Sequence, residues 1–214
     1  MKFTVSEVQV ADAESLIRKC DFPAIQDDPL HRIMFPRSCP DTWESEIRWM
    51  VKNLKNTLER EWSNFRKICA EDGTPIGFSG WTLEQSDVPQ VIENQSSEQK
   101  DESAIPEPDT LDMHAWLDTS KMLREEKRRI LHGRKNIWRL MIISVDPAYQ
   151  RQGVGSMLMQ WGCEEADRNE RDAFVLASPA AVRLYAKFGF EVVGQVETKE
   201  GVLRSMFRKA QNQA

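Results

Sequence analysis

The sequence predicts an α/β protein built on a mixed sheet with helices packed on its faces. Residues 137–209 alternate strand-like and helix-like segments, which is typical of strands joined by crossover helices. Two strand-like segments meet at the turn 199–201, and an earlier pair meets at the turn 71–75. Because such hairpins add antiparallel neighbours, we expect a sheet with both parallel and antiparallel pairs.

The elements of the first half follow from hydrophobic periodicity and turn residues. A helix over 11–20 would bury Leu16 and Ile17, and Asp41 is the expected cap of a second helix. The expected elements are a strand over 3–10, helices over 11–20 and 41–60, and hairpin strands over 64–70 and 76–84.

The second half begins with a long helix and then alternates strands with helices. Ser178 and Pro179 are a good N-cap and a good first helical residue for the helix after the second strand. The expected elements are a helix over 110–132, a strand over 137–145, a helix over 154–168, a strand over 172–178, a helix over 179–188, and strands over 190–197 and 201–209.

Length and composition are typical of a globular protein. The chain has 214 residues, 40% of them hydrophobic, and a net charge of -5. We therefore expect a single domain over 1–214 with no nucleic acid as partner. No segment is long and apolar enough to span a membrane or to serve as a signal peptide, so we expect a cytoplasmic protein, with the nucleus left open.

The acidic charge is concentrated in one segment, 85–109. It holds seven acidic residues against the single basic residue Lys100, among Ser, Gln and Pro. A segment with so little apolar surface is predicted to be a flexible insertion. A solvated spacer and a regulatory or substrate-guiding role both remain open.

The cysteines and histidines show no metal-ligand spacing, so no metal is expected. We expect the four cysteines to be reduced packing residues.

The stretch VDPAYQRQGVGSML, residues 145–158, is suited to bind a phosphate. A loop with Gly153 and Gly155 leads directly into an amphipathic helix, whose first N–H groups lack intrahelical partners. The Walker pattern fails for lack of a lysine before Ser156, and the dinucleotide pattern fails because Leu158 stands where glycine is required.

These residues carry a family resemblance. Gln150–Gly155 is similar to the Q/R-x-x-G-x-G/A pyrophosphate loop of the Gcn5-related N-acetyltransferases (GNAT), which bind acetyl-CoA. The resemblance extends to Val145 and Pro147 upstream and to LYAKFGFEVVG downstream, and covers residues 137–194. It implies a GNAT-like central mixed, mostly antiparallel sheet of about seven strands, with a splayed strand pair forming the acetyl-CoA cleft.

The resemblance also implies the residues that hold the cofactor. Main-chain groups of Ile143 and Val145 would pair with the pantetheine arm, and the loop beginning at Gln150 would cradle the pyrophosphate. The family often has asparagine where this chain has Ser178, so a pantetheine contact there departs from the pattern. The implied set is Ile143, Val145, Gln150, Arg151, Gln152, Gly153, Val154, Gly155, Ser156 and Ser178.

The implied activity is direct transfer of the acetyl group of acetyl-CoA to a primary amine, with Tyr185 as general acid for the CoA thiolate. A tyrosine packed under the sheet is the alternative interpretation of Tyr185. A non-catalytic acyl-CoA-binding or protein-interaction module is the alternative function. No general base stands out, and neither the acceptor nor the oligomeric state follows from the sequence.

Overall fold

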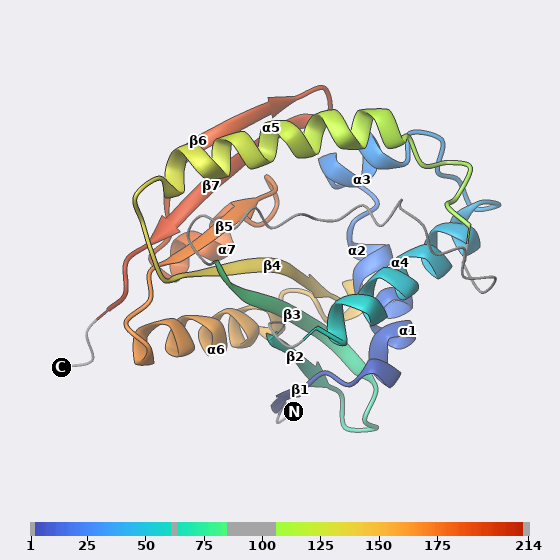
Figure 1. Cartoon of the computed structure of the whole chain (residues 1–214). Helices are drawn as coiled ribbons and strands as arrows, with labels where there is room; N and C mark the ends of the chain where they lie inside the picture. Colours follow the sequence, from blue (N-terminus) through green and yellow to red (C-terminus); the bar gives the residue numbers. More distant parts are fainter. Residues whose placement is uncertain (1–2, 61–63, 85–105, 212–214) are drawn as a thin grey trace.

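A seven-stranded sheet forms the centre of the computed structural model, which describes residues 3–60, 64–84 and 106–211. The strand order is β1-β2-β3-β4-β5-β7-β6 (Figure 1). Strands β4 and β5 run parallel, and the other neighbouring pairs of this sheet run antiparallel. The predicted mixed, mostly antiparallel sheet of about seven strands is therefore confirmed.

The strand bounds agree closely with the sequence prediction after the first strand. That strand ends early because Val10–Asp12 forms a 3-10 turn, in which the Asp12 carboxylate accepts a hydrogen bond from the Gln9 amide at 2.7 Å. The strands are β1 Val5–Glu7, β2 Asn64–Cys69, β3 Pro75–Glu84, β4 Ile137–Val145, β5 Ala173–Ala177, β6 Glu191–Thr198 and β7 Gly201–Arg208.

One face of the sheet is covered by the N-terminal helices and α5, the other by α6 and α7 (Figure 1). Phe78 of β3 packs against Leu16 and Leu54 on the first face. Trp81, also on β3, packs against Met159 on the second. The helices are α1 Ala13–Ser15, α2 Phe22–Ala24, α3 Pro29–Met34, α4 Trp43–Leu58, α5 Met113–Leu131, α6 Val154–Arg168 and α7 Val182–Lys187.

The N-terminal helical region differs most from prediction. The expected helix 11–20 is a continuous but irregular run whose middle, η2 Leu16–Asp21, has π-helical geometry and which continues through α2. Helix α3 was not predicted, because six residues are too few to show a periodic pattern. Helix α4 has Thr42 and not Asp41 at its N-cap. The predicted burial of Leu16 and Ile17 is confirmed.

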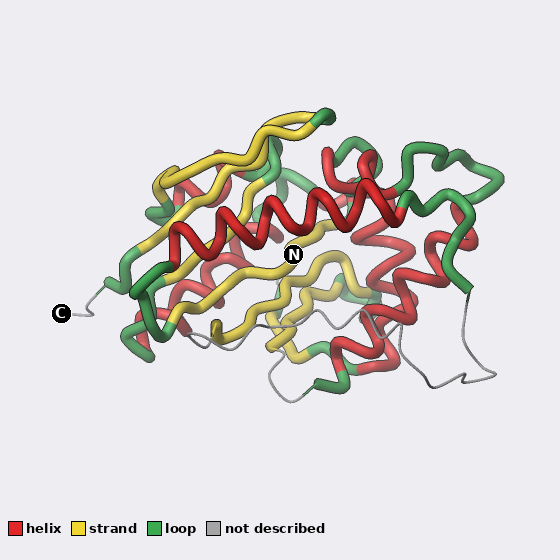
Figure 2. Tube along the Cα trace, turned by 45° about the horizontal axis from the view of Figure 1, so that its top comes forward, coloured by secondary structure: helices red, strands yellow, loops and turns green. Residues whose placement is uncertain are grey.

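Helix α5 crosses in front of several strands (Figure 2) and is tied to α3 at its start. The Asp112 carboxylate caps it by accepting from the Ala115 amide at 2.9 Å, and the Asp112 amide donates to the Met34 carbonyl at 2.7 Å. The predicted acidic insertion lies outside the described residues except for 106–109. Within the described ranges, no helix is both long and apolar enough to cross a membrane.

Candidate functional site

The parallel strands β4 and β5 pair over only part of their length. Their register runs from Trp138 opposite Ala173 to Leu140 opposite Val175 and ends there. Strand β4 continues to Val145, while β5 stays paired with β7 up to Ala177. The carboxyl half of β4 therefore separates from β5, as the family resemblance implied.

A β-bulge lies at the point where β4 leaves β5. Gly80 of β3 faces Ile142 and Trp81 faces Leu140, so Met141 is an extra residue in β4. A bulge bends its strand and increases the local twist. Met141 and Ile142 both pack with the N-terminal helices, whereas Ile143 packs on the α6 side. The bulge thus bends β4 away from β5 and resets the direction of the side chains that follow.

The loop between β4 and α6 is held by its own side chains. Asp146 accepts from the Ala148 amide at 2.9 Å, the Gln150 amide group donates to the Val145 carbonyl at 3.2 Å, and that of Gln152 donates to the Ala148 carbonyl at 3.0 Å. Arg151 has a φ of 63° and Gly153 a φ of 92°. A left-handed conformation at Gly153 is what glycine permits at little cost.

The first turn of α6 presents unpaired backbone donors. The first intrahelical bond runs from the Met157 amide to the Gly153 carbonyl at 3.0 Å, so the amides of Val154, Gly155 and Ser156 have no acceptor within the helix. A Cβ placed on Gly155 would lie 3.4 Å from Leu184 of α7. Because of this close approach, α7 is held directly beside the amino end of α6.

Tyr185 lies in α7 at 3% exposure, in the core cluster that also contains Trp138 and Met206. Its ring centroid is 6.1 Å from that of Phe190. Burial raises the pKa of its phenol, and the negative charge of Asp28 raises that pKa further. The phenol is thus protonated at neutral pH and lies within electrostatic reach of the amino end of α3.

Ser178 does not cap α7. The helix begins at Val182 with Ala181 at its N-cap, so the predicted start at 179 is wrong. Residues 179–181 form a turn in which the Ala181 amide donates to the Ser178 carbonyl at 3.0 Å. Proline at 179 is therefore accommodated by a turn, and not by the first helical position.

Comparison with known proteins agrees with this geometry. Residues 122–192 match the family model of the acetyltransferase (GNAT) domain. Arylalkylamine N-acetyltransferase 2 from Aedes aegypti aligns over 99% of this chain and 100% of its own, with 16% identity and a TM-score of 0.69. An acetyltransferase from Corynebacterium glutamicum, described as histone acetyltransferase HPA2 and related acetyltransferase, aligns over 100% of both chains with 17% identity and a TM-score of 0.64.

The chain has the GNAT fold. The PaiA N-acetyltransferase from Thermoplasma acidophilum, solved in complex with coenzyme A, also aligns, over 98% of this chain and 99% of its own, with 15% identity and a TM-score of 0.55. No curated protein matches the sequence. The predicted resemblance to the GNAT superfamily is confirmed.

The N-terminal helices of this GNAT fold carry buried acidic side chains that the sequence did not predict. Asp21, 4% exposed at the end of η2, accepts a hydrogen bond from the Ser144 hydroxyl of β4. Burial raises the pKa of the Asp21 carboxyl to about 6, the charge of Asp28 adds to the rise, and the Ser144 hydrogen bond opposes it. This contact ties the helical region to the separated half of β4.

Glu46 is a second buried carboxylate, fully inaccessible on α4. It accepts from the hydroxyls of Ser38 at 2.8 Å, Thr42 at 3.1 Å and Thr110 at 2.8 Å. His31 Nε2 lies 3.6 Å from its Oε2, and burial lowers the pKa of the His31 imidazole. The hydrophobic periodicity that predicted this helix gave no signal that Glu46 would be buried.

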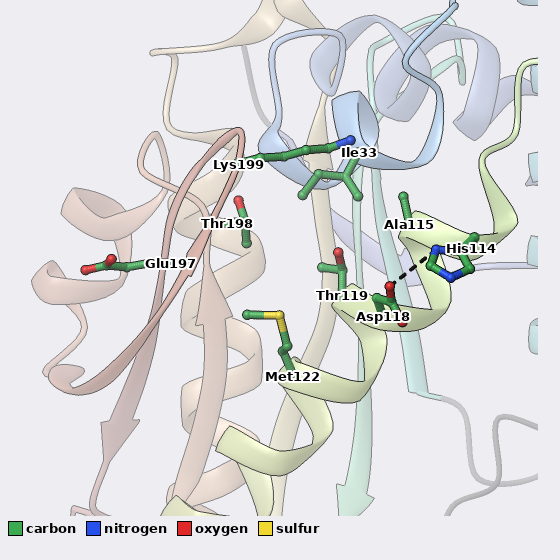
Figure 3. A pocket seen from close by; sticks show the side chains of 9 residues that line it. All are labelled: Ile33, His114, Ala115, Asp118, Thr119, Met122, Glu197, Thr198 and Lys199. Atoms are coloured by element: carbon green, nitrogen blue, oxygen red, sulfur yellow. Dashed lines mark ion pairs between the residues drawn. The ribbon is translucent and has the colours of Figure 1, made fainter.

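A groove on the same face of the GNAT fold lies between α3, α5 and the β6–β7 hairpin (Figure 3). Its cavity of about 490 Å³ is lined by Ile33, Thr119 and Met122 among others. The hairpin closes it by contact with α3, since a Cβ placed on Gly201 would lie 3.3 Å from Pro29 Cγ. The residues that line it come from α3, α5 and the hairpin, and none belongs to the two helices predicted over 11–20 and 41–60.

Some surface features of the fold lie outside this site. The basic half of α5 forms ion pairs: Arg129 binds Glu126 at 2.7 Å, and Lys127 binds Glu84 of β3. Trp43 of α4 is 38% exposed. Cys39 is exposed, so it is not the packing residue that was expected.

Proposed function

We propose that the chain is an acetyl-CoA-dependent N-acetyltransferase that transfers the acetyl group directly to a primary amine. The proposal rests on one observation: three features that could bind and use acetyl-CoA lie on neighbouring elements. The separated half of β4, the unpaired amides of α6 and buried Tyr185 belong to adjoining elements, linked by the contact between Gly155 and Leu184. The GNAT match over residues 122–192 supports it.

The α6 loop would hold the pyrophosphate of CoA. Amides at the start of a helix combine donor groups with the positive end of the helix dipole, which favours an anion. The proposed contacts are the amides of 151–156, with Gln150 and Gln152 fixing the loop through their bonds to Val145 and Ala148. The guanidinium of Arg151, which is exposed, can add a charged contact to a phosphate.

The separated half of β4 would hold the pantetheine arm. Beyond Leu140 no strand among the described residues pairs with the edge of β4 that faced β5, so the main-chain groups of Ile143 and the amide of Val145 can bond an extended ligand in place of a strand. The Val145 carbonyl already accepts from the Gln150 side chain. Ser178 follows directly after β5, on the opposite side of the separation. Acetyl-CoA supplies the acetyl thioester when it is bound.

Tyr185 would act as the general acid. The amine nitrogen attacks the thioester carbonyl carbon, the C–N bond forms, and the C–S bond breaks. The Tyr185 phenol, kept protonated by its raised pKa, gives its proton to the leaving sulfur. The acetylated nitrogen loses one proton to solvent, and solvent returns a proton to the Tyr185 phenolate. Asp28, whose charge acts on Tyr185, would attract the acceptor ammonium, which loses a proton to solvent before it attacks.

The test begins with calorimetric binding of acetyl-CoA to the wild type and to Gly153→Glu. The added carboxylate would stand where the pyrophosphate binds, so we expect binding by the wild type and none by the folded variant. Failure of the folded wild type to bind acetyl-CoA would overturn the proposal. An amine screen then follows, and it includes arylalkylamines because the Aedes aegypti neighbour is named for them.

A non-catalytic acyl-CoA-binding module is the second candidate, favoured by the absence of an identified general base. Tyr185→Phe discriminates between the two candidates. For the enzyme we expect kcat to fall about 100-fold or more, since general acid catalysis contributes on that scale, with acetyl-CoA affinity retained. Acetyl-CoA binding without turnover of any amine by the wild type would favour the module.

A further inference from the structure

Asp21 is a buried carboxyl group that is satisfied by one neutral side chain. It is 4% exposed, and the hydrogen bond that its carboxylate accepts comes from the Ser144 hydroxyl. Glu46, a second buried carboxylate, accepts from three hydroxyls. Among the described residues no cation forms an ion pair with Asp21, and the charge of Asp28 opposes its ionisation. An aspartate at this position therefore does not stabilise the fold at neutral pH, which favours a functional role.

The partner Ser144 lies in the separated half of β4, between the two residues that are proposed to hold the pantetheine arm. The Asp146 amide donates to a carbonyl of β3 at 2.9 Å. Because main-chain groups of successive strand residues point to opposite edges, those of Ser144 also point to β3, whereas those of Ile143 and Val145 point to the open edge. Asp21 is therefore bonded to the strand residue between the proposed pantetheine contacts.

Side chains of this half of β4 are directed to both faces of the sheet. Ile143 and Val145 pack on the α6 side, and Ser144 is directed to the opposite face, where η2 lies. The bond to Asp21 thus fixes β4 from the face that α6 does not cover. The thiol of the preceding residue, Cys20, donates to a carbonyl of β3 at 3.6 Å. Adjacent residues of η2 therefore bond the two neighbouring strands β3 and β4.

This half of β4 depends on contacts with its faces, because it has a strand neighbour on one edge only. Strand β3 pairs with it up to Val145, and the β-bulge at Met141 interrupts that pairing. Within the described ranges, no strand pairs with its other edge beyond Leu140. A hydrogen bond fixes direction as well as distance, unlike the apolar contacts of the same half. The bond between Asp21 and Ser144 therefore limits how far the open edge can shift or turn.

The strength of this bond depends on the ionisation of Asp21. Burial raises the pKa of the carboxyl to about 6, and the charge of Asp28, the N-cap of α3, adds to the rise. The Ser144 hydroxyl opposes the rise in pKa, which means that it bonds the ionised form more strongly. The other charged or titratable groups of the elements around Asp21 are Arg18, Lys19 and Cys20 of η2, Glu44 of α4, which binds Arg18, and Asp146 after β4.

We propose, on the basis of the proposed function, that Asp21 is a positioning residue for acetyl-CoA. Its carboxylate, through Ser144, holds the open edge of β4 where the main-chain groups of Ile143 and the Val145 amide receive the pantetheine arm. Asp21 does not touch the ligand and takes no part in proton transfer to the sulfur or from the amine. Because a charged acceptor makes the stronger bond, acetyl-CoA affinity should fall when Asp21 is protonated.

The test measures acetyl-CoA affinity by calorimetry between pH 5 and pH 8 for the wild type and Asp21→Asn. Asparagine keeps an acceptor for Ser144 but carries no charge. At pH 8 we expect the variant to bind about fivefold more weakly, since a hydrogen bond to a charged group is about twice as strong as a neutral one. The ratio of the two affinities should fall to about one at pH 5, with a midpoint at about pH 6. Taking the ratio removes the titration of the ligand's own phosphate.

Ser144→Ala removes the same bond from its other partner. It should weaken acetyl-CoA binding at pH 8 at least as much as Asp21→Asn, and the double variant should lose no more than Ser144→Ala. Ser38→Ala is the matched control, because Ser38 donates to the buried carboxylate of Glu46 on α4, and it should bind acetyl-CoA as the wild type does. Lost stability would not explain the expected result, because Asp21→Asn should be no less stable than the wild type at neutral pH.

Backbone NMR reports the position of β4 without acetyl-CoA. The amide signals of Ile143 and Val145 should shift with pH in the wild type, with a midpoint at about pH 6, and should not do so in Asp21→Asn. If acetyl-CoA binds and the ratio of affinities stays constant across the pH range, the inference is overturned and the proposed function stands. If the folded wild type binds no acetyl-CoA, the proposed function is refuted. The amide shifts then decide whether Asp21 positions β4, and their absence overturns that as well.

Discussion

The two sides of the β4–β5 separation are built by different means. On the α6 side, the proposed cofactor contacts come from backbone groups in a loop with glycine at the position of left-handed φ. On the side of the N-terminal helices, buried side chains such as Asp21, His31 and Glu46 make the connections. The α6 side therefore depends on local backbone geometry. The side of the N-terminal helices depends on ionisable side chains that are buried away from water.

This difference predicts how each side should respond to substitution or to a change of pH. A backbone site is encoded by a short stretch of sequence and is sensitive to added bulk or to a forbidden φ. A network of buried carboxylates depends on every partner that satisfies it and is sensitive to protonation or truncation. Substitutions on the helical side should therefore affect stability most.

The largest effect is expected for Glu46→Ala. Its carboxylate accepts three hydroxyl hydrogen bonds and lies 3.6 Å from His31 Nε2. Because truncation leaves these partners buried without it, we expect the free energy of unfolding to fall by about 3–5 kcal/mol in chemical denaturation. Glu44→Ala, at an exposed position on the same helix, is the control. Equal losses in the two variants would show that the buried network contributes nothing specific.

A smaller, pH-dependent effect is expected for Asp21→Asn. The folded-state pKa of Asp21 is raised to about 6, so the wild type has the full benefit of the neutral carboxyl below the unfolded pKa, near 4, and loses it as pH rises through 6. Asparagine cannot ionise. Between pH 4 and pH 7 the wild type should therefore lose up to about 3 kcal/mol relative to the variant, at about 1.4 kcal/mol per pKa unit.

Urea denaturation of both proteins across this pH range measures that difference. Parallel stability curves for wild type and Asp21→Asn would contradict the raised pKa. Ser144→Ala provides a second check, because loss of the hydroxyl that bonds the Asp21 carboxylate should raise the pKa further and move the transition to higher pH.

The smallest effect on stability is expected on the backbone side, for Gly153→Ala. The φ of 92° disfavours alanine, so unfolding should become easier by about 1–2 kcal/mol. Gly73→Ala is a matched control, since Gly73 has a φ of 82° and a Cβ on either glycine would have no atom within 4 Å. Both variants should lose similar stability, but only Gly153→Ala should lose acetyl-CoA affinity by calorimetry. Equal affinity in the two would place the pyrophosphate elsewhere.

The sequence by itself determined the elements whose signals are local. Strand Ile137–Val145 and helix Val154–Arg168 have the predicted bounds, because hydrophobic periodicity and glycine positions act over a few residues. The GNAT resemblance and the predicted phosphate-binding loop at Gln150–Ser156 were also recognised from a short local pattern. The mixed sheet followed from the order of elements along the chain.

Only the tertiary structure decided how the N-terminal helices meet this sheet. The burial of Glu46, the bond between Asp21 and Ser144, and the groove beside Met122 each join residues far apart in sequence. The short helix α3 also exists through such contacts, because six residues give little intrinsic helical stability. Hydrophobic periodicity predicts which residues form a helix or a strand. Whether a polar side chain is buried depends on the hydrogen-bond partners that other segments place around it.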